Sequence, residues 1–352
     1  MQSTQTLDLL KIKHPIIQGP FGGGLSTVEL VSTVSNLGGL GSFGVHYLEA
    51  DGILGVASEI REKTSNPFAL NLWVSDHDPE ARDFSADAYD RAWRLFEPLY
   101  RELDLPKPEQ PPRFHPSFDE QVEAILEAKP DVFSFVFGIP SARILEACKA
   151  KGITTVGAAT TLAEAQALEA ANVDVILATG FEAGGHRPSF LERAEDCLMG
   201  TMPLTRVVSD SCSKPVIAAG GIVDSHGIEA ALQLGAGAAQ LGTAFLACAE
   251  SGTVDQHRTA LFSDRSANSE LTRAYTGRLA RGMPNRLIKD MKDAAAQLAP
   301  FPVQAWFVAP LRAASIAAGD DDFLSLYANQ AAPLLKHRKT ADLMADLIAG
   351  IA

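Results

Sequence analysis

Two glycine-containing turns in the second half of the chain are candidates for binding an anion. Gly220-Gly221 follows the apolar run at 215–219, and Gly242-Thr243 follows the run at 238–241. Each turn stands where a helix is expected to begin, so backbone N–H groups and two positive helix ends could point at one phosphate. Either pair alone is also typical of a simple left-handed turn, and that alternative remains open.

A third candidate is the segment TGFEAGGHR, which holds the only concentration of ionisable residues at an expected strand end. Gly184 and Gly185 allow the backbone to approach a flat ligand closely. His186 follows at once and can hydrogen-bond or accept a proton near neutral pH. A structural or merely exposed histidine is the alternative. Glu182 is either an acid or a residue that orients the loop.

Other reaction types lack their residues at the expected strand ends. No carboxylate pair, Ser/His/Asp set or metal-ligand cluster converges there, and no lysine is placed to hold pyridoxal phosphate. An anion site with few reactive side chains favours a phosphorylated cofactor that carries the chemistry itself. From the residues alone, flavin mononucleotide (FMN) and a phosphorylated substrate both remain open.

The elements that would position these residues alternate regularly. Eight short apolar runs, each followed by a helical pattern, are found at 14–20, 40–43, 67–73, 131–137, 153–158, 173–178, 215–219 and 238–241. This count predicts a (β/α)8 barrel, with the two glycine turns in the last two βα loops, a recurrent phosphate site. A doubly wound sheet is the alternative, although Gly-x-Gly-x-x-Gly is missing after the first strand.

The alternation is interrupted once, which suggests a second domain. Residues 1–74 and 117–250 are expected to form the barrel, with helices in 311–352 packed on its outside. The charged, proline-rich stretch at 75–116, together with 251–310, is expected to form a smaller helical or irregular domain on the substrate side. Aromatic residues at helical spacing within 84–103 are more typical of a local core than of substrate contacts.

The composition of the chain excludes some classes of binding partner. The chain has 352 residues, 46% of them hydrophobic, and a net charge of -13 without a basic cluster, which argues against nucleic acid and anionic membranes. Its most apolar long window, 230–249, is broken by polar residues and glycines, and no signal peptide is evident. Four widely separated cysteines indicate reduced packing residues. A cytoplasmic location is therefore expected, and a homodimer is left open.

Several segments, in the same order along the chain, are similar to one known family. They are HPIIQGPFGGGLST, NLGGLGSFG, NPFALNLW, GFEAGGH, PVIAAGGI, AQLGTAFL, LTRAYTGRLARGMPN and DFLSLYANQAAPL. Together they resemble the nitronate monooxygenases, once called 2-nitropropane dioxygenases, and within them the class I branch. The resemblance extends from His14 to the C-terminal helices.

That resemblance implies an FMN-containing barrel with a smaller helical domain, which oxidises alkyl nitronates such as propionate 3-nitronate with dioxygen to carbonyl compounds and nitrite. His186 would bind the nitronate or act as base on a neutral nitroalkane. The implied phosphate residues are Gly220, Gly221, Gly242 and Thr243, with Gln240 and Leu241 beside them. The implied ring and ribityl contacts are Gln18, Gly19, Pro20, Phe21, Asn71, Thr179 and Gly184.

The sequence departs from that family at two of these positions. Thr179 stands where glutamine is common, and Phe21 where methionine is common. Both changes affect the expected substrate more than the expected cofactor. Two other functions stay open: an NAD(P)H-dependent FMN reductase of quinones or enoyl thioesters on the same barrel, and a non-catalytic FMN-binding protein.

Overall fold

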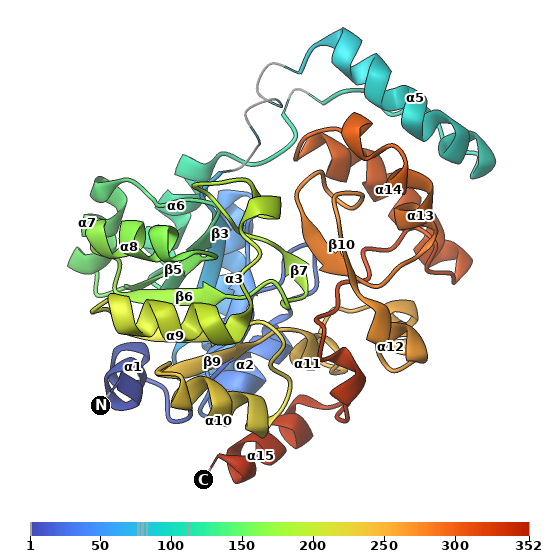
Figure 1. Cartoon of the computed structure of the whole chain (residues 1–352). Coiled ribbons are helices and arrows are strands. Elements are labelled where there is room, and N and C mark those ends of the chain that lie inside the picture. The colour runs from blue at the N-terminus through green and yellow to red at the C-terminus, as the bar shows by residue number, and fades with distance from the viewer. Residues whose placement is uncertain (1, 76–77, 79–80, 82–83, 112, 352) are drawn as a thin grey trace.

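Eight parallel strands form a closed barrel in the computed structural model, which describes residues 2–75, 78, 81, 84–111 and 113–351. The strands are hydrogen-bonded in the order β1-β9-β8-β6-β5-β4-β3-β2. A parallel bridge between Ile17 and Leu40 joins the first and last strands of this series and closes the barrel (Figure 1). The (β/α)8 prediction is confirmed, and the doubly wound alternative is wrong.

The barrel elements follow the predicted alternation. The strands are β1 (Ile16–Gln18), β2 (Gly41–Gly44), β3 (Phe68–Trp73), β4 (Val132–Val136), β5 (Thr154–Ala159), β6 (Val175–Thr179), β8 (Val216–Ala219) and β9 (Ala238–Leu241). The helices that follow them are α2 (Val28–Asn36), α3 (Ala50–Lys63), α6 (Phe118–Ala128), α7 (Ala142–Ala150), α8 (Leu162–Ala170), α9 (Thr201–Ser211), α10 (Ser225–Gln233) and α11 (Thr243–Leu246).

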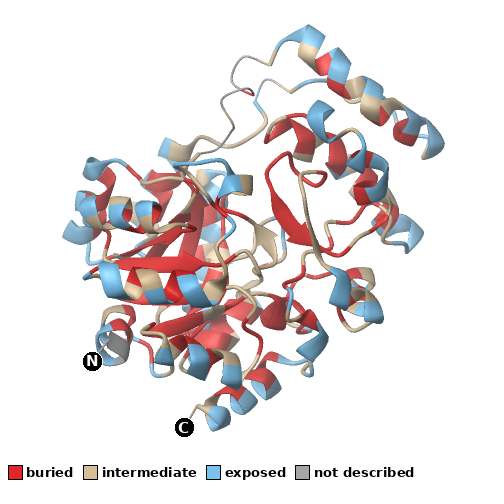
Figure 2. Cartoon of the chain, in the orientation of Figure 1, coloured by how far each residue is buried: buried red, intermediate tan, exposed pale blue. Residues whose placement is uncertain are grey.

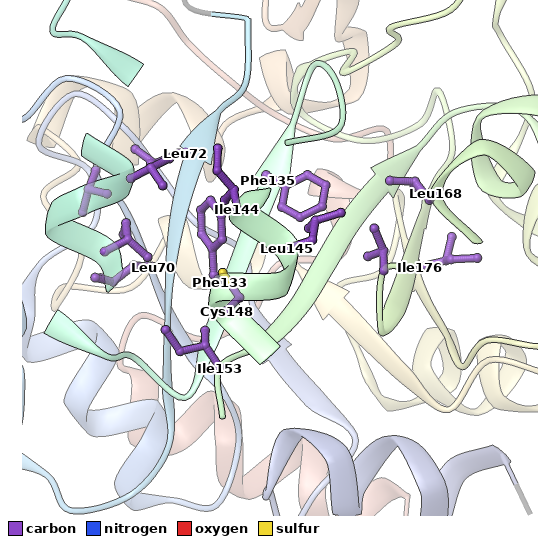
Figure 3. Packing of buried hydrophobic residues seen from close by; sticks show 14 of the residues in the cluster. Leu70, Leu72, Phe133, Phe135, Ile144, Leu145, Cys148, Ile153, Leu168 and Ile176 are labelled. Atoms are coloured by element: carbon purple, nitrogen blue, oxygen red, sulfur yellow. The ribbon is translucent and has the colours of Figure 1, made fainter. Parts of the chain in front are cut away.

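Each barrel strand buries both of its faces, which is why the strands appear in the sequence as continuous apolar runs. Ala69 and Val132 belong to the core inside the barrel. Their neighbours Leu70 and Phe133 belong to the core between strands and helices, where α7 packs on β4 (Figure 3). Burial of one such leucine or phenylalanine contributes on the order of 2 kcal/mol. The strands accordingly form the buried centre of the barrel in Figure 2.

Side chains that precede the helices fix where the helices begin. The hydroxyls of Thr27 and Thr161 and the carboxylate of Asp224 each accept a hydrogen bond from a backbone N–H in the first turn. Glu164, three residues after Thr161, does not accept a hydrogen bond from the Thr161 N–H, because its carboxylate accepts from Thr160 N and Oγ1 instead. Glu164 thereby anchors the end of β5.

An N-terminal helix that the sequence did not predict covers one end of the barrel. Helix α1 (Gln2–Leu10) contributes Leu10 to the interior core, and Thr154 Oγ1, at the start of β5, donates to Leu9 O at 3.2 Å. Because α1 lies at the amino ends of the strands, the carboxyl ends are left for the functional site.

The remaining elements form a second group beside the barrel (Figure 1). Its helices are α5 (Ala86–Glu102), α12 (Asp255–Leu261), α13 (Arg286–Lys292) and α14 (Val303–Ala318), with 3-10 turns η2 (Asp264–Asn268) and η3 (Ala295–Gln297). Its strand β10 (Glu270–Thr272) pairs with β11 (Ala280–Gly282), and β11 pairs in turn with β7 (Gly185–His186), which follows β6 in the chain. The 3-10 turn η1 (Ala194–Asp196) lies between β7 and α9.

The C-terminal part differs from the sequence expectation in two places. The expected boundary at residue 311 falls inside α14, whose Phe307 and Leu311 share a core with Phe96 of α5. Helices were expected in 311–352, but 323–331 form turns and a bridge, followed by η4 (Ala332–Leu334) and the single helix α15 (Thr340–Gly350). Helix α15 does pack on the outside of the barrel, against α2 and α10. None of the described helices is long and apolar enough to cross a lipid bilayer.

Candidate active site

A cavity of about 540 Å³ lies at the carboxyl ends of the strands, between the barrel and the second group of elements. Most of the predicted site residues line it: Gly19, Pro20, Phe21, Asn71, Thr179, Gly184, His186, Gly220, Gln240, Gly242 and Thr243. Its volume is that of a pocket for a cofactor-sized ligand. The structure therefore brings residues from six separate segments of the chain to one cavity.

Three predicted residues lie behind the cavity wall. Gln18 is fully buried, and its side chain accepts a hydrogen bond from Ser42 N at 2.9 Å and donates to Gly19 O. Leu241 is fully buried in the barrel core. Gly221 is packed over Glu182, so close that an added Cβ would lie 3.2 Å from the Glu182 Cβ. These residues shape the wall without lining the cavity.

The two glycine turns leave several backbone donors unused. Gly220 and Gly221 have φ values of +112° and +67°, a conformation that L side chains rarely adopt. After this turn, the N–H of Ile222 has no hydrogen-bond partner among the described residues, and neither do those of Gly242 and Thr243. Because all three residues line the cavity, their free N–H groups fit a phosphate.

The helix ends contribute less to this site than the sequence suggested. The first turn of α10 is already capped by the Asp224 carboxylate, which accepts from Gly227 N at 2.9 Å. Helix α11 has only four residues. The candidate donors for a phosphate are therefore individual backbone N–H groups, and the expectation of two positive helix ends aimed at one phosphate stays a prediction.

His186 is held by the second group of elements as well as by the barrel. Its strand, β7, pairs with β11, and its Nε2 lies 2.7 Å from Thr276 Oγ1. The imidazole packs edge-on against Trp73, with ring centroids 4.9 Å apart. Burial, helped by the positive charge of Arg278, lowers the pKa of His186 to about 3. The ring is therefore neutral at physiological pH.

Arg278 supplies that charge from within the cavity wall. Its guanidinium stacks on Phe137 and Phe301, at 4.1 and 4.3 Å from the ring centroids. It also pairs with Asp78 at 2.8 Å. A cation fixed in this way keeps the neighbouring imidazole uncharged.

The other ionisable groups of the His186 loop are engaged in holding the loop. The Glu182 carboxylate accepts from Thr201 N at 2.7 Å and from the Thr201 hydroxyl at 2.5 Å. Arg187 is buried and donates to Thr179 O at 2.8 Å and to Cys197 O at 2.9 Å. Of the two roles considered for Glu182, the geometry favours orienting the loop. No group of three or more His, Cys, Asp or Glu among the described residues could hold a metal ion.

Comparisons with known proteins show the family of this chain. The family model described as nitronate monooxygenase matches residues 3–350. The chain belongs to the nitronate monooxygenase family. Enzymes of this family are oxidoreductases that use a flavin, and the cavity with its neutral histidine and free N–H groups accommodates such a cofactor.

Curated relatives match the chain over nearly its full length. A nitronate monooxygenase of Paraburkholderia phytofirmans is 41% identical over 97% of this chain and 93% of its own. Another, from Pseudomonas aeruginosa, is 39% identical over 97% of both chains. Among solved structures, a nitroalkane oxidase from Streptomyces ansochromogenes has a TM-score of 0.90 and 33% identity, covering 98% of this chain and 97% of its own. FabK from Thermotoga maritima has a TM-score of 0.74 and 27% identity, covering 99% and 95%.

This nitronate monooxygenase family member also has cavity residues that the sequence reasoning missed. Tyr47 precedes α3, and 41% of its surface is exposed although it lines the cavity. Trp73 ends β3, two residues after Asn71, and the placement of functional residues at strand ends would have indicated it. Arg312, His257 and Tyr327 come from the C-terminal third, where no strand alternation marks positions that face a site.

Proposed function

We propose that this enzyme binds FMN and oxidises alkyl nitronates, such as propionate 3-nitronate, with dioxygen to carbonyl compounds and nitrite. The observation that carries the proposal is that one cavity holds both an imidazole kept neutral by burial and a set of unpaired backbone N–H groups. The first suits a base or a nitronate-binding group, and the second a phosphate.

The cavity residues divide into those for the phosphate and those for the flavin ring. Ile222, Gly242 and Thr243 would donate to the phosphate. Gly19, Pro20, Phe21 and Gly184 would contact the ring and ribityl chain, Gln240 would lie beside the phosphate segment, and Asn71 and Thr179 would face the polar edge of the ring. Bound FMN would supply electron acceptance from the substrate and reaction with dioxygen.

His186 would meet the substrate through Nδ1, because its Nε2 is engaged by Thr276. The Thr276 hydroxyl can accept or donate, so both neutral tautomers are available. With Nε2–H donated to Thr276, Nδ1 carries a lone pair and can remove the α-proton of a neutral nitroalkane. With the Thr276 hydroxyl as donor, Nδ1–H can bind the oxygen of an anionic nitronate.

Arg312 supports a substrate with a second negative charge. It lines the cavity from α14, and it is the only arginine or lysine among the described residues that do so. Within the described part of the chain it has neither an ion pair nor a hydrogen bond. The carboxylate of propionate 3-nitronate is a suitable partner, since a guanidinium binds carboxylates in a bidentate manner.

An anaerobic absorbance titration tests the function. We expect the purified protein to show an FMN spectrum that propionate 3-nitronate bleaches and NADH does not. Bleaching by NADH alone would replace the proposal with an NAD(P)H-dependent reductase. A flavin spectrum that neither compound changes would indicate a non-catalytic flavin protein.

A further inference from the structure

The segment 325–330 lies directly against the Gly242-Thr243 turn and against the loop at 182–184. The N–H of Asn329 donates to Thr243 Oγ1 at 3.0 Å, and the N–H of Gln330 donates to Glu182 O at 3.1 Å. Gly184 is pressed on the same segment, because an added Cβ would lie 2.7 Å from Asn329 N. These contacts fix the Asn329 backbone beside the unpaired N–H groups.

The Asn329 side chain is buried there without a full set of partners. The residue is 3% exposed and lines the cavity. Its Oδ1 has no hydrogen-bond partner, and no hydrogen bond of its amide to any other described residue is present. Buried side-chain amides nearly always have partners within the protein, in a ligand or in an ordered water. A side-chain amide presents either its oxygen or its nitrogen by rotation about one bond.

A phosphate in the anion site would give the Asn329 amide a hydrogen-bond partner. The donors already identified there, Ile222, Gly242 and Thr243, are neutral backbone groups. An additional N–H donor would strengthen binding of a phosphate, because hydrogen bonds to an ionised acceptor are about twice as strong as neutral ones. Asn329 has two such hydrogens and no competing acceptor among the described residues.

We propose that the Asn329 side-chain amide donates to the phosphate of the bound flavin and so helps the enzyme select the phosphorylated flavin over riboflavin. This assignment rests on the proposed FMN function. Asn329 lies outside the two glycine turns. It belongs to the same segment as Tyr327, and the ring centroid of Tyr327 lies 5.7 Å from that of His186.

The test compares two flavins that differ only in the phosphate. Flavin is removed from the purified protein, and the Kd values of FMN and riboflavin are measured by quenching of flavin fluorescence. For Asn329→Ala we expect a Kd for FMN raised about 10-fold or more, and for Asn329→Asp a larger increase from charge repulsion. The Kd for riboflavin should change less than about 2-fold in Asn329→Ala. The neighbouring exposed side chain provides a matched control, since Gln330→Ala should alter neither Kd.

Each other outcome has a defined meaning. If Asn329→Ala weakens both flavins equally, the residue supports the fold of the cavity and the proposal is wrong. An unchanged Kd for FMN would also overturn it, and would leave an ordered water as the partner of the amide. Failure of the wild-type protein to bind either flavin would contradict the FMN function itself, which separates that result from a failure at Asn329.

Discussion

His186 is the residue on which the proposed chemistry depends most directly. We expect His186→Asn to retain FMN, because the imidazole is not among the groups assigned to the phosphate or the polar ring edge. Turnover of a neutral nitroalkane should fall by about 100-fold or more, the contribution of a general base. Steady-state kinetics together with the flavin absorbance per protein would check both statements.

Thr276→Val provides the control for that experiment. It removes the 2.7 Å contact to His186 Nε2 but leaves the ring in place. We expect a smaller loss of turnover than in His186→Asn, because the imidazole is still present and its Nδ1 can still accept a proton when the other ring nitrogen carries the hydrogen. Turnover of His186→Asn at the wild-type rate would rule out the catalytic role of the histidine.

Arg312 provides a prediction about substrate choice. In Arg312→Met, KM for propionate 3-nitronate should rise about 10- to 100-fold, the effect of losing a hydrogen-bonded ion pair. For ethyl nitronate, which has no carboxylate, KM should change by less than about 3-fold. Arg312→Lys should lie between wild type and Arg312→Met for the charged substrate. Equal effects of Arg312→Met on both nitronates would contradict a carboxylate contact.

The residues found from sequence and those missed differ in a physical respect. His186 and Gly220 follow strands that bury both faces, and Asn71 lies near the end of such a strand; an uninterrupted apolar run marks where the strand ends. Arg312 lies on a helix of the second group, where a polar residue that faces a cavity looks the same in sequence as one that faces solvent. Whether Arg312 faces the cavity depends on how the second group packs against the barrel, and local sequence does not encode that packing.

At the scale of elements, long and strongly apolar patterns were predictable and short pairings were not. All eight barrel strands were found, with boundaries shifted by a few residues. Strand β7 has two residues and β11 has three, too few to show a period of two. The turns at 323–331 contain apolar residues that resemble a helical pattern, but their positions are fixed by contacts with Thr243 and Glu182.

The turn between β9 and α11 permits a prediction that separates folding from cofactor binding. Gly242 has a φ of -100°, and an added Cβ would lie 3.8 Å from its nearest neighbour, Phe21. Gly242→Ala should therefore fold and bind FMN. Gly242→Asp would place a carboxylate at the N–H groups assigned to the phosphate, so its Kd for FMN should rise about 100-fold or more.

The flavin content of the two purified variants, measured by absorbance, checks this prediction. Circular dichroism would confirm that Gly242→Asp is folded. Purification of Gly242→Asp with a full complement of FMN would place the phosphate elsewhere in the cavity.

At the scale of the whole molecule, the cavity belongs to neither group of elements alone. The barrel contributes Gly220, Gly242, Asn71 and Trp73, whereas Thr276 and Arg312 come from the second group. The pairing of β7 with β11 places His186 at the junction between them. The electrostatic environment of the histidine therefore exists only when both groups are folded and in contact.

Burial of several uncharged histidines at this junction has a consequence for the stability of the whole protein. Burial lowers the pKa of His257 to about 4, and its Nε2 lies 2.9 Å from Tyr327 O. It also lowers the pKa of His186 to about 3 and that of His46 well below its usual range. In the unfolded chain these side chains regain a pKa near 6.5. The unfolded state then binds more protons than the folded state at any pH between these values.

The free energy of unfolding should therefore be constant above about pH 7 and fall as the pH drops below 6.5. A shift from 6.5 to about 4 in His257 corresponds to about 3 kcal/mol, of which about 2 kcal/mol is lost by pH 5. Urea unfolding of the flavin-free protein at pH 7 and pH 5 measures this difference. His257→Gln should be less sensitive to acid, because glutamine has no charged form to favour unfolding. His226→Gln, at an exposed position on α10, should retain the full pH dependence. An equal loss of stability in wild type and His257→Gln would show that carboxylates, not the buried histidines, dominate acid unfolding of this enzyme.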